Sequence, residues 1–147
     1  MFYNGCSRDL SRVTGDVLHG VVAAMAMTGM RSLTKGLGIV RLTPPEELGR
    51  HGAGAPLLRR AAPERRGAAL ELAHWTYGAL GAAAYSFAPP RAHRSKTAGA
   101  AYGLALWALF EAVIAPVAGA DRERPVAERL ALAADHVLYG LVLTSGR

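Results

Sequence analysis

The sequence is poor in the residues and motifs on which disulfide-rich proteins and most enzymes depend. It contains one cysteine, Cys6, which excludes an internal disulfide framework, and asparagine and glutamine are nearly absent. It has no glycine-rich phosphate loop, no G-x-S-x-G and no H-E-x-x-H motif. No charged-then-apolar pattern precedes residue 16, so we expect no cleavable signal peptide. These absences favour a protein that is not an enzyme.

Apolar residues make up 51% of the 147-residue chain and gather in four segments. The segment 63–88 begins with a proline and an arginine pair and ends at Pro89. Its length is about what an α-helix needs to cross a hydrocarbon core of about 30 Å. We predict three further spans, which run from Thr14 or Asp16 towards Leu37, over about 97–119, and from Pro125 to the C-terminus.

The net charge of +6 comes mostly from arginines between these segments, as is typical of the flanks of membrane spans. Arg31 and Lys35, near the end of the first helix, can extend to the lipid headgroups. No helix carries a basic stripe with interleaved aromatics, so no nucleic-acid partner is predicted. The sequence therefore predicts an all-α, multi-pass protein of a bacterial inner (plasma) membrane, with the lipid bilayer as its partner. A soluble four-helix bundle is the alternative, because alanine-rich helices that carry Glu and His insert only marginally.

The longest connection, residues 38–62, contains a helix-start signal. Thr43 is followed by Pro44 and, three residues on, by Glu46, which is the spacing of a capping box with proline at the first helical position. We therefore predict a short surface helix near residues 44–50.

Two parts of the chain resemble each other. PERRGAALELAHWTYG (63–78) and PVAERLALAADHVLYG (125–140) align without a gap and share a proline, an alanine, a leucine, a histidine, a tyrosine and a glycine. A fainter match pairs His19-Gly20 with Tyr102-Gly103. We predict a four-transmembrane-helix bundle built from a duplicated helical hairpin in one domain. Hairpin one covers about 14–88 with the inserted loop 38–62, and hairpin two covers about 97–146.

Polar side chains cluster by depth in the predicted spans. Glu71 and His74 lie one turn apart on one helix face. At 1.5 Å per residue, Glu111 and the Asp135-His136 pair fall on the same side of the midplane or close to it, whereas Asp16 and His19 fall nearer the opposite side. Ionisable groups inside a membrane are costly and mark functional sites. The predicted polar layer consists of Glu71, His74, Tyr77, Glu111, Asp135, His136 and Tyr139.

Several functions are compatible with this layer. The histidines can form hydrogen bonds across helices and fix their register, or the layer can relay protons or ions in a small transporter-like or accessory protein. A redox subunit that binds haem or a metal is an alternative, although Ala133 replaces the glutamate of a second Glu-x-x-His motif. The candidate ligands are His74, His136, Glu71 and Glu111. Glycine-rich faces would also suit a homo-oligomer or a structural subunit of a larger membrane complex.

Three features form a pattern over most of the chain: His19-Gly20, Pro44-Pro45, and His74-x-x-Tyr77-Gly78-x-x-Gly81-x-x-x-Tyr85. In these features the chain resembles the small bacterial inner-membrane proteins of the YagU type. The resemblance implies an integral membrane protein linked to acid stress, with no assigned reaction. The arginine-rich insertion around residues 50–66 departs from that pattern.

Overall fold

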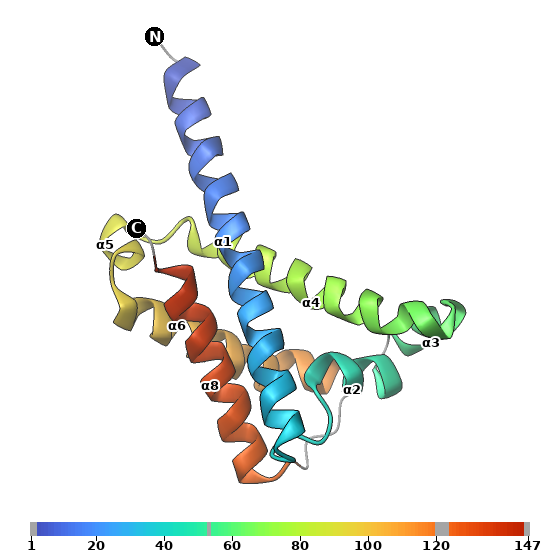
Figure 1. The fold of residues 1–147 in the computed structure, drawn as a ribbon. Helices are drawn as coiled ribbons and strands as arrows, with labels where there is room; N and C mark the ends of the chain where they lie inside the picture. Colours follow the sequence, from blue (N-terminus) through green and yellow to red (C-terminus); the bar gives the residue numbers. More distant parts are fainter. Residues whose placement is uncertain (1–2, 53, 120–123, 146–147) are drawn as a thin grey trace.

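The computed structural model describes residues 3–52, 54–119 and 124–145, and these residues are almost entirely helical and form no strand (Figure 1). Within them, two segments are long and apolar enough to cross a membrane: Val13–Gly36 and Lys96–Val117. The elements in chain order are α1 (Tyr3–Gly36), α2 (Pro44–His51), α3 (Ala55–Arg60), α4 (Pro63–Tyr85), α5 (Pro90–His93), α6 (Lys96–Leu109), the π-helical segment η1 (Phe110–Ile114), α7 (Ala115–Val117) and α8 (Val126–Leu143).

Proline marks two helix starts where the sequence predicts them. Pro63 is the first residue of α4, and Pro125 directly precedes α8. Proline suits the first turn because the amide hydrogen it lacks would have no partner inside the helix. The predicted span 97–119 corresponds to α6, η1 and α7 in succession.

The first helix begins earlier than predicted, at Tyr3 instead of near Thr14 or Asp16. Residues 3–43 contain no proline, so no residue in that stretch prevents a helix from forming. The prediction followed hydropathy, which marks where the apolar part begins and not where the helix begins. At the other end of the chain, α8 ends at Leu143, whereas residue 146, the predicted end of hairpin two, lies outside the described residues.

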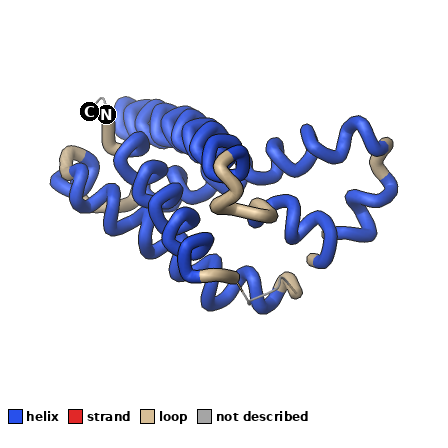
Figure 2. The backbone as a smooth tube through the Cα atoms, turned by 60° about the horizontal axis from the view of Figure 1, so that its bottom comes forward, coloured by secondary structure: helices blue, strands red, loops and turns tan. Residues whose placement is uncertain are grey.

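The four long helical segments pack in the spatial order α4, α1, α8, α6. Helices α1 and α8 lie side by side and run in opposite directions, and α4 crosses α1 (Figure 1). Viewed after a 60° turn, α2, α3 and the start of α4 form an arm that projects away from the other helices (Figure 2). The structure therefore places α1 and α8 at the centre, each with one further long helix against it.

The helices approach one another most closely at glycines. A Cβ atom built on Gly20 of α1 would lie 2.7 Å from the carbonyl oxygen of Gly78 on α4. A Cβ atom on Gly103 of α6 would overlap the carbonyl oxygen of His136 on α8, and one on Gly140 would overlap the carbonyl of Gly99. Only glycine allows backbones to come this close, as small residues do at helix interfaces in membranes.

Helix α2 begins with the predicted capping box. The backbone amide of Glu46 donates to Thr43 Oγ1 at 3.4 Å, and the backbone amide of Thr43 donates to Glu46 Oε2 at 2.9 Å. Lys35 Nζ donates to the other carboxylate oxygen of Glu46. Burial alone would raise the pKa of Glu46, but the hydrogen bonds from Lys35 and Thr43 outweigh it and lower the pKa. A lowered pKa means that this contribution to stability is present above the ordinary value of 4.5 and is lost as the pH falls through the folded-state value.

Replacing the capping hydroxyl should destabilise α2. We expect Thr43→Ala to lower the free energy of unfolding by about 1 kcal/mol, because the Glu46 amide loses its acceptor. Thermal unfolding in detergent measures the change. Thr76→Ala is the matched control, since exposed Thr76 only donates to the Leu72 carbonyl within its own helix. Equal losses in the two variants would contradict a capping role for Thr43.

Candidate functional site

A cavity of about 190 Å³ lies where α1, the start of α2, α4, η1 and α8 come together. Its wall is mostly apolar. The apolar lining residues are Met27, Pro44, Pro45, Leu48, Leu70, Ala73, Phe110, Ile114 and Leu132. The polar lining residues are Arg31, His74, Tyr77, Asp135 and His136. An apolar pocket with a few convergent polar groups is the usual form of a small-molecule site.

The structure brings part of the predicted polar layer together. His74, Tyr77, Asp135 and His136 all line the cavity, although α4 and α8 are separated by about 60 positions in the sequence. The other predicted members do not line it. Glu71, Glu111 and Tyr139 each engage a different partner.

The polar groups of the cavity are deeply buried, and several have unused hydrogen-bonding atoms. Asp135 is 1% exposed and Arg31 is 3% exposed. In the described part of the chain, no hydrogen-bond partner exists for either carboxylate oxygen of Asp135, for Arg31 Nε, for His74 Nε2 or for the Tyr77 hydroxyl. Buried polar atoms in folded proteins almost always have partners, so an unused group of them points to water or a ligand.

His136 has a defined tautomer when neutral. Its Nδ1 lies 2.8 Å from the carbonyl oxygen of Leu132. A carbonyl oxygen can only accept, so Nδ1 carries the hydrogen, and Nε2 of the neutral ring is left as an acceptor. The ring can therefore accept a proton at Nε2 without losing its bond to the helix backbone.

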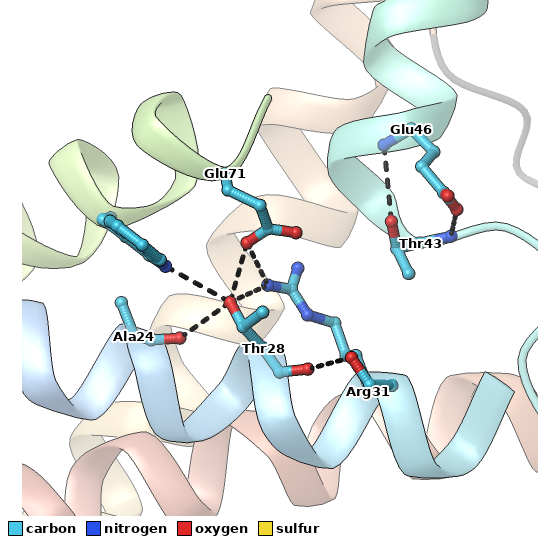
Figure 3. A network of polar contacts seen from close by, with 8 residues as sticks. Ala24, Thr28, Arg31, Thr43, Glu46 and Glu71 are labelled. Carbon is cyan, nitrogen blue, oxygen red and sulfur yellow. Dashed lines mark hydrogen bonds and ion pairs between the residues drawn. The ribbon is translucent and has the colours of Figure 1, made fainter. Parts of the chain in front are cut away.

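Glu71 lies beside the cavity and anchors Arg31 (Figure 3). Thr28 Oγ1 donates to Glu71 Oε2 at 2.8 Å, and Arg31 Nη2 lies 3.9 Å from the same oxygen. Arg31 Nη2 also donates to Thr28 Oγ1 at 3.2 Å, and Trp75 Nε1 lies 3.3 Å from that hydroxyl. Glu71 thus supports the position of Arg31 and does not itself line the cavity.

The burial of Arg31 corrects the prediction that this side chain reaches the lipid headgroups. Gly20, Ala24, Met27 and Arg31 recur every three or four residues, so they share one face of α1. That face packs against the other helices, because the first three of these residues are buried as well. The spacing from Gly20 was the signal in the sequence that could have identified Arg31 as inward-facing.

Glu111 is held away from the cavity by Arg124, a residue that sequence reasoning missed. Arg124 Nη1 donates to Glu111 Oε1 at 2.6 Å, and Arg124 Nη2 forms an ion pair with Glu47 of α2. The side chains of Arg124 and Glu47 are only 6% and 5% exposed. Glu111 lies in the π-helical segment η1, and π-bulges often occur at functional sites. This buried cluster connects η1, α2 and Arg124, which lies two residues before α8.

Tyr139 has a structural contact. Its hydroxyl donates to the carbonyl oxygen of Gly78 at 2.6 Å, which joins α8 to α4. In the same way, the Tyr102 hydroxyl donates to the Gly81 carbonyl at 2.6 Å and joins α6 to α4. These two bonds connect α4 to both helices of the second pair, α8 and α6.

The candidate metal ligands do not gather into one ligand set. Within the described ranges, no three side chains of His, Cys, Asp or Glu lie close enough together to hold a metal ion. His74 and His136 share the cavity wall, but Glu71 pairs with Arg31 and Glu111 with Arg124. Asp16 and His19 line a separate hollow with His93, as their predicted depth implied.

Comparison with known proteins adds no relative. No protein-family model, no curated protein and no solved structure matches this chain. The likeness to YagU-type proteins therefore stays a prediction, and the chemistry of the site rests on its own residues.

Proposed function

We propose that this chain is a small integral membrane protein in which four helical segments cross the bilayer as two tandem hairpins. In this proposal, the cavity between them is a proton or ion relay site of a transporter-like or accessory protein. The observation that carries the proposal is the buried Asp135 carboxylate, whose oxygens have no donor among the described residues and which shares one cavity with two histidines.

The outward-facing apolar surface supports a lipid environment. Only 28% of the residues in the most apolar 18-residue stretch of Val13–Gly36 are buried, and only 17% in that of Lys96–Val117. A core helix of a soluble protein would be mostly buried. Large apolar side chains are exposed on every long helix. Examples are Leu18 and Val22 on α1, Leu72 and Leu80 on α4, Leu104 and Leu109 on α6, and Leu130 on α8. Exposing these apolar side chains to lipid tails costs no free energy, whereas exposing them to water does.

The total surface area supports the same environment. The chain exposes 9135 Å², whereas a compact soluble monomer of its 15.4 kDa exposes about 7,200 Å². The excess reflects helices that are packed on one side and open on the other. This arrangement would leave a soluble protein prone to aggregation.

The glycine contacts support the duplicated hairpin. Gly20 faces Gly78 between α1 and α4, and Gly103 approaches Gly140 between α6 and α8. In the alignment of the two halves, Gly20 corresponds to Gly103 and Gly78 corresponds to Gly140. Each half therefore has its corresponding glycines in the interface between its two helices, as expected if both descend from one hairpin.

The unused polar atoms favour a relay over a purely structural role. A purely structural role would leave few buried polar atoms without partners, yet His74 Nε2 and both Asp135 oxygens have none in the described part of the chain. A cavity of 190 Å³ holds about six waters at about 30 Å³ each. Such waters would connect the carboxyl of Asp135 with His74 and Tyr77, and protons would pass along the resulting hydrogen bonds.

Proton flux into liposomes tests the proposal. Purified protein is reconstituted with a trapped pH-sensitive dye, and a pH gradient is imposed with valinomycin and potassium to balance charge. We expect flux above that of protein-free liposomes. In Asp135→Asn we expect flux at the protein-free level, because the amide cannot exchange a proton.

Glu64→Gln is the control variant, since Glu64 is exposed in the first turn of α4, away from the cavity. It should retain the flux of the unchanged protein. Flux that is no greater than that of empty liposomes would overturn the relay, and co-purification with a fixed membrane partner would then favour an accessory subunit. Protein that stays folded and monomeric in detergent-free buffer would overturn the membrane location.

A further inference from the structure

Two opposite charges border the cavity without contacting each other. Arg31 belongs to α1 and Asp135 to α8, and no ion pair joins them among the described residues. They are nonetheless close enough to interact electrostatically. Arg31 Nε and both Asp135 oxygens have no hydrogen-bond partner in the described part of the chain, and buried polar atoms left in this way are destabilising. A single molecule in the cavity can therefore form hydrogen bonds with Arg31 and Asp135 at the same time.

We infer that the cavity binds a small zwitterion of the aliphatic α-amino acid class. Its carboxylate would accept from Arg31 Nε, and its ammonium group would donate to the oxygens of Asp135. This inference rests on the proposed function, because it names the substrate class of the same cavity.

The atoms without partners, Arg31 Nε and the two Asp135 oxygens, favour a zwitterion over a simple anion or cation. An anion would pair with Arg31 but would face Asp135, and it would compete with Glu71, which is 3.9 Å from the guanidinium. A cation would pair with Asp135 but would face Arg31. A zwitterion adds no net charge, and it supplies an acceptor for Arg31 Nε and donors for the Asp135 oxygens, which have no partner among the described residues. The two other unused atoms, His74 Nε2 and the Tyr77 hydroxyl, can accept from the ammonium group or donate to the carboxylate.

The size and lining of the cavity indicate a short aliphatic body. A cavity of about 150 Å³ holds benzene, so a volume of 190 Å³ corresponds to about eight non-hydrogen atoms, the size of valine. Met27, Leu70, Ile114 and Leu132 supply apolar contacts from four different helical elements. These side chains would exclude water from the body of the ligand and favour branched aliphatic chains over polar ones.

Isothermal titration calorimetry on the full chain in detergent tests the inference. The probes are valine, isobutylamine (which lacks the carboxylate), 3-methylbutanoate (which lacks the ammonium group) and glycine (which lacks the apolar body). We expect valine to bind and each of the other three to bind at least about tenfold more weakly, because each lacks one of the contacts.

The variants provide the second half of the test. Asp135→Asn and Arg31→Gln should each weaken valine binding by at least about tenfold, and Glu64→Gln should leave it unchanged. Because a cavity variant can fail to fold, circular dichroism and gel filtration accompany each titration. The probe series on the unchanged protein remains decisive in either case.

Several outcomes would overturn the inference. Valine that does not bind the unchanged protein would leave a cavity filled with water only. Isobutylamine or 3-methylbutanoate binding as tightly as valine would assign the cavity to organic cations or anions. Proton flux that depends on Asp135, measured on the same preparation without valine binding, would overturn this inference but keep the relay. If neither Asp135-dependent proton flux nor valine binding is observed, the relay and this inference are both overturned.

Discussion

Replacing Arg124 by glutamine should lower the free energy of unfolding by about 3–5 kcal/mol, the cost of breaking a buried ion pair from one side. The side chains of Arg124 and Glu47 are nearly inaccessible, and Glu111 is 14% exposed. Without the guanidinium, Glu47 stays buried with no ion pair among the described residues, and Glu111 keeps only the half-exposed Arg129. Thermal unfolding in detergent should show Tm reduced by on the order of 10 °C.

Arg129→Gln is a matched control for Arg124→Gln. Arg129 is half exposed and lies 3.9 Å from the same Glu111, so its pairing is screened by solvent. We expect its loss to cost less than about 1 kcal/mol. Equal losses in the two variants would contradict a buried cluster around Arg124.

A triple variant that removes the three charges of the cluster separates the effect of unpaired charge on stability from the effect of packing. When Arg124→Met is combined with Glu47→Gln and Glu111→Gln, no charge remains unpaired in the cluster, so the triple variant should be more stable than Arg124→Gln alone. The same cluster supports the wall of the cavity. Pro44 and Leu48 of α2, together with Phe110 and Ile114 of η1, line the cavity, and Arg124 holds these two elements together.

The second large effect is expected at the interface of α6 and α8. A Cβ atom on Gly103 would overlap the carbonyl group of His136, and no side-chain rotation can relieve a clash with the backbone. We expect Gly103→Ala to separate the two helices and to lower the free energy of unfolding by about 1–3 kcal/mol or more. Because the clash involves His136 itself, proton flux should fall with stability. Thermal unfolding and the liposome assay measure the two effects.

Gly29→Ala is the control for this glycine. Gly29 lies inside α1, and a Cβ atom there would meet none of the described atoms within 4 Å. Alanine forms helix better than glycine, so this variant should gain up to about 1 kcal/mol. If Gly103→Ala proved as stable as Gly29→Ala, the close contact of α6 and α8 would be refuted.

Local signals in the sequence predicted the helix boundaries well. Pro63 and Pro125 set the starts of α4 and α8 because proline is disfavoured inside a helix but accepted in its first turn. Thr43 and Glu46 identified α2 because a capping box involves only residues three apart. The start of α1 was predicted too late, because the sequence offers no comparable signal between residue 3 and the apolar part.

The depth of the polar groups was partly predictable. The rise per residue of a helix is constant, so His74 and His136 could be placed at similar depths, and both line the cavity. The position of a residue along its helix does not identify the side chains that it contacts, however. Glu111 has a suitable depth but binds Arg124, and Glu71 binds Thr28 and Arg31.

The chain's own sequence determined the helical class, the positions of α2, α4 and α8, and the pair of histidines. Each of these follows from interactions within a few residues or from a constant helical rise. Only the tertiary structure decided that Arg31 lies beside Glu71 of α4, that Glu47 and Arg124 form an ion pair across 77 positions, and that Asp135 has no protein partner among the described residues. These outcomes depend on which helix faces meet, and that choice is made by packing over the whole chain at once, which no local pattern encodes.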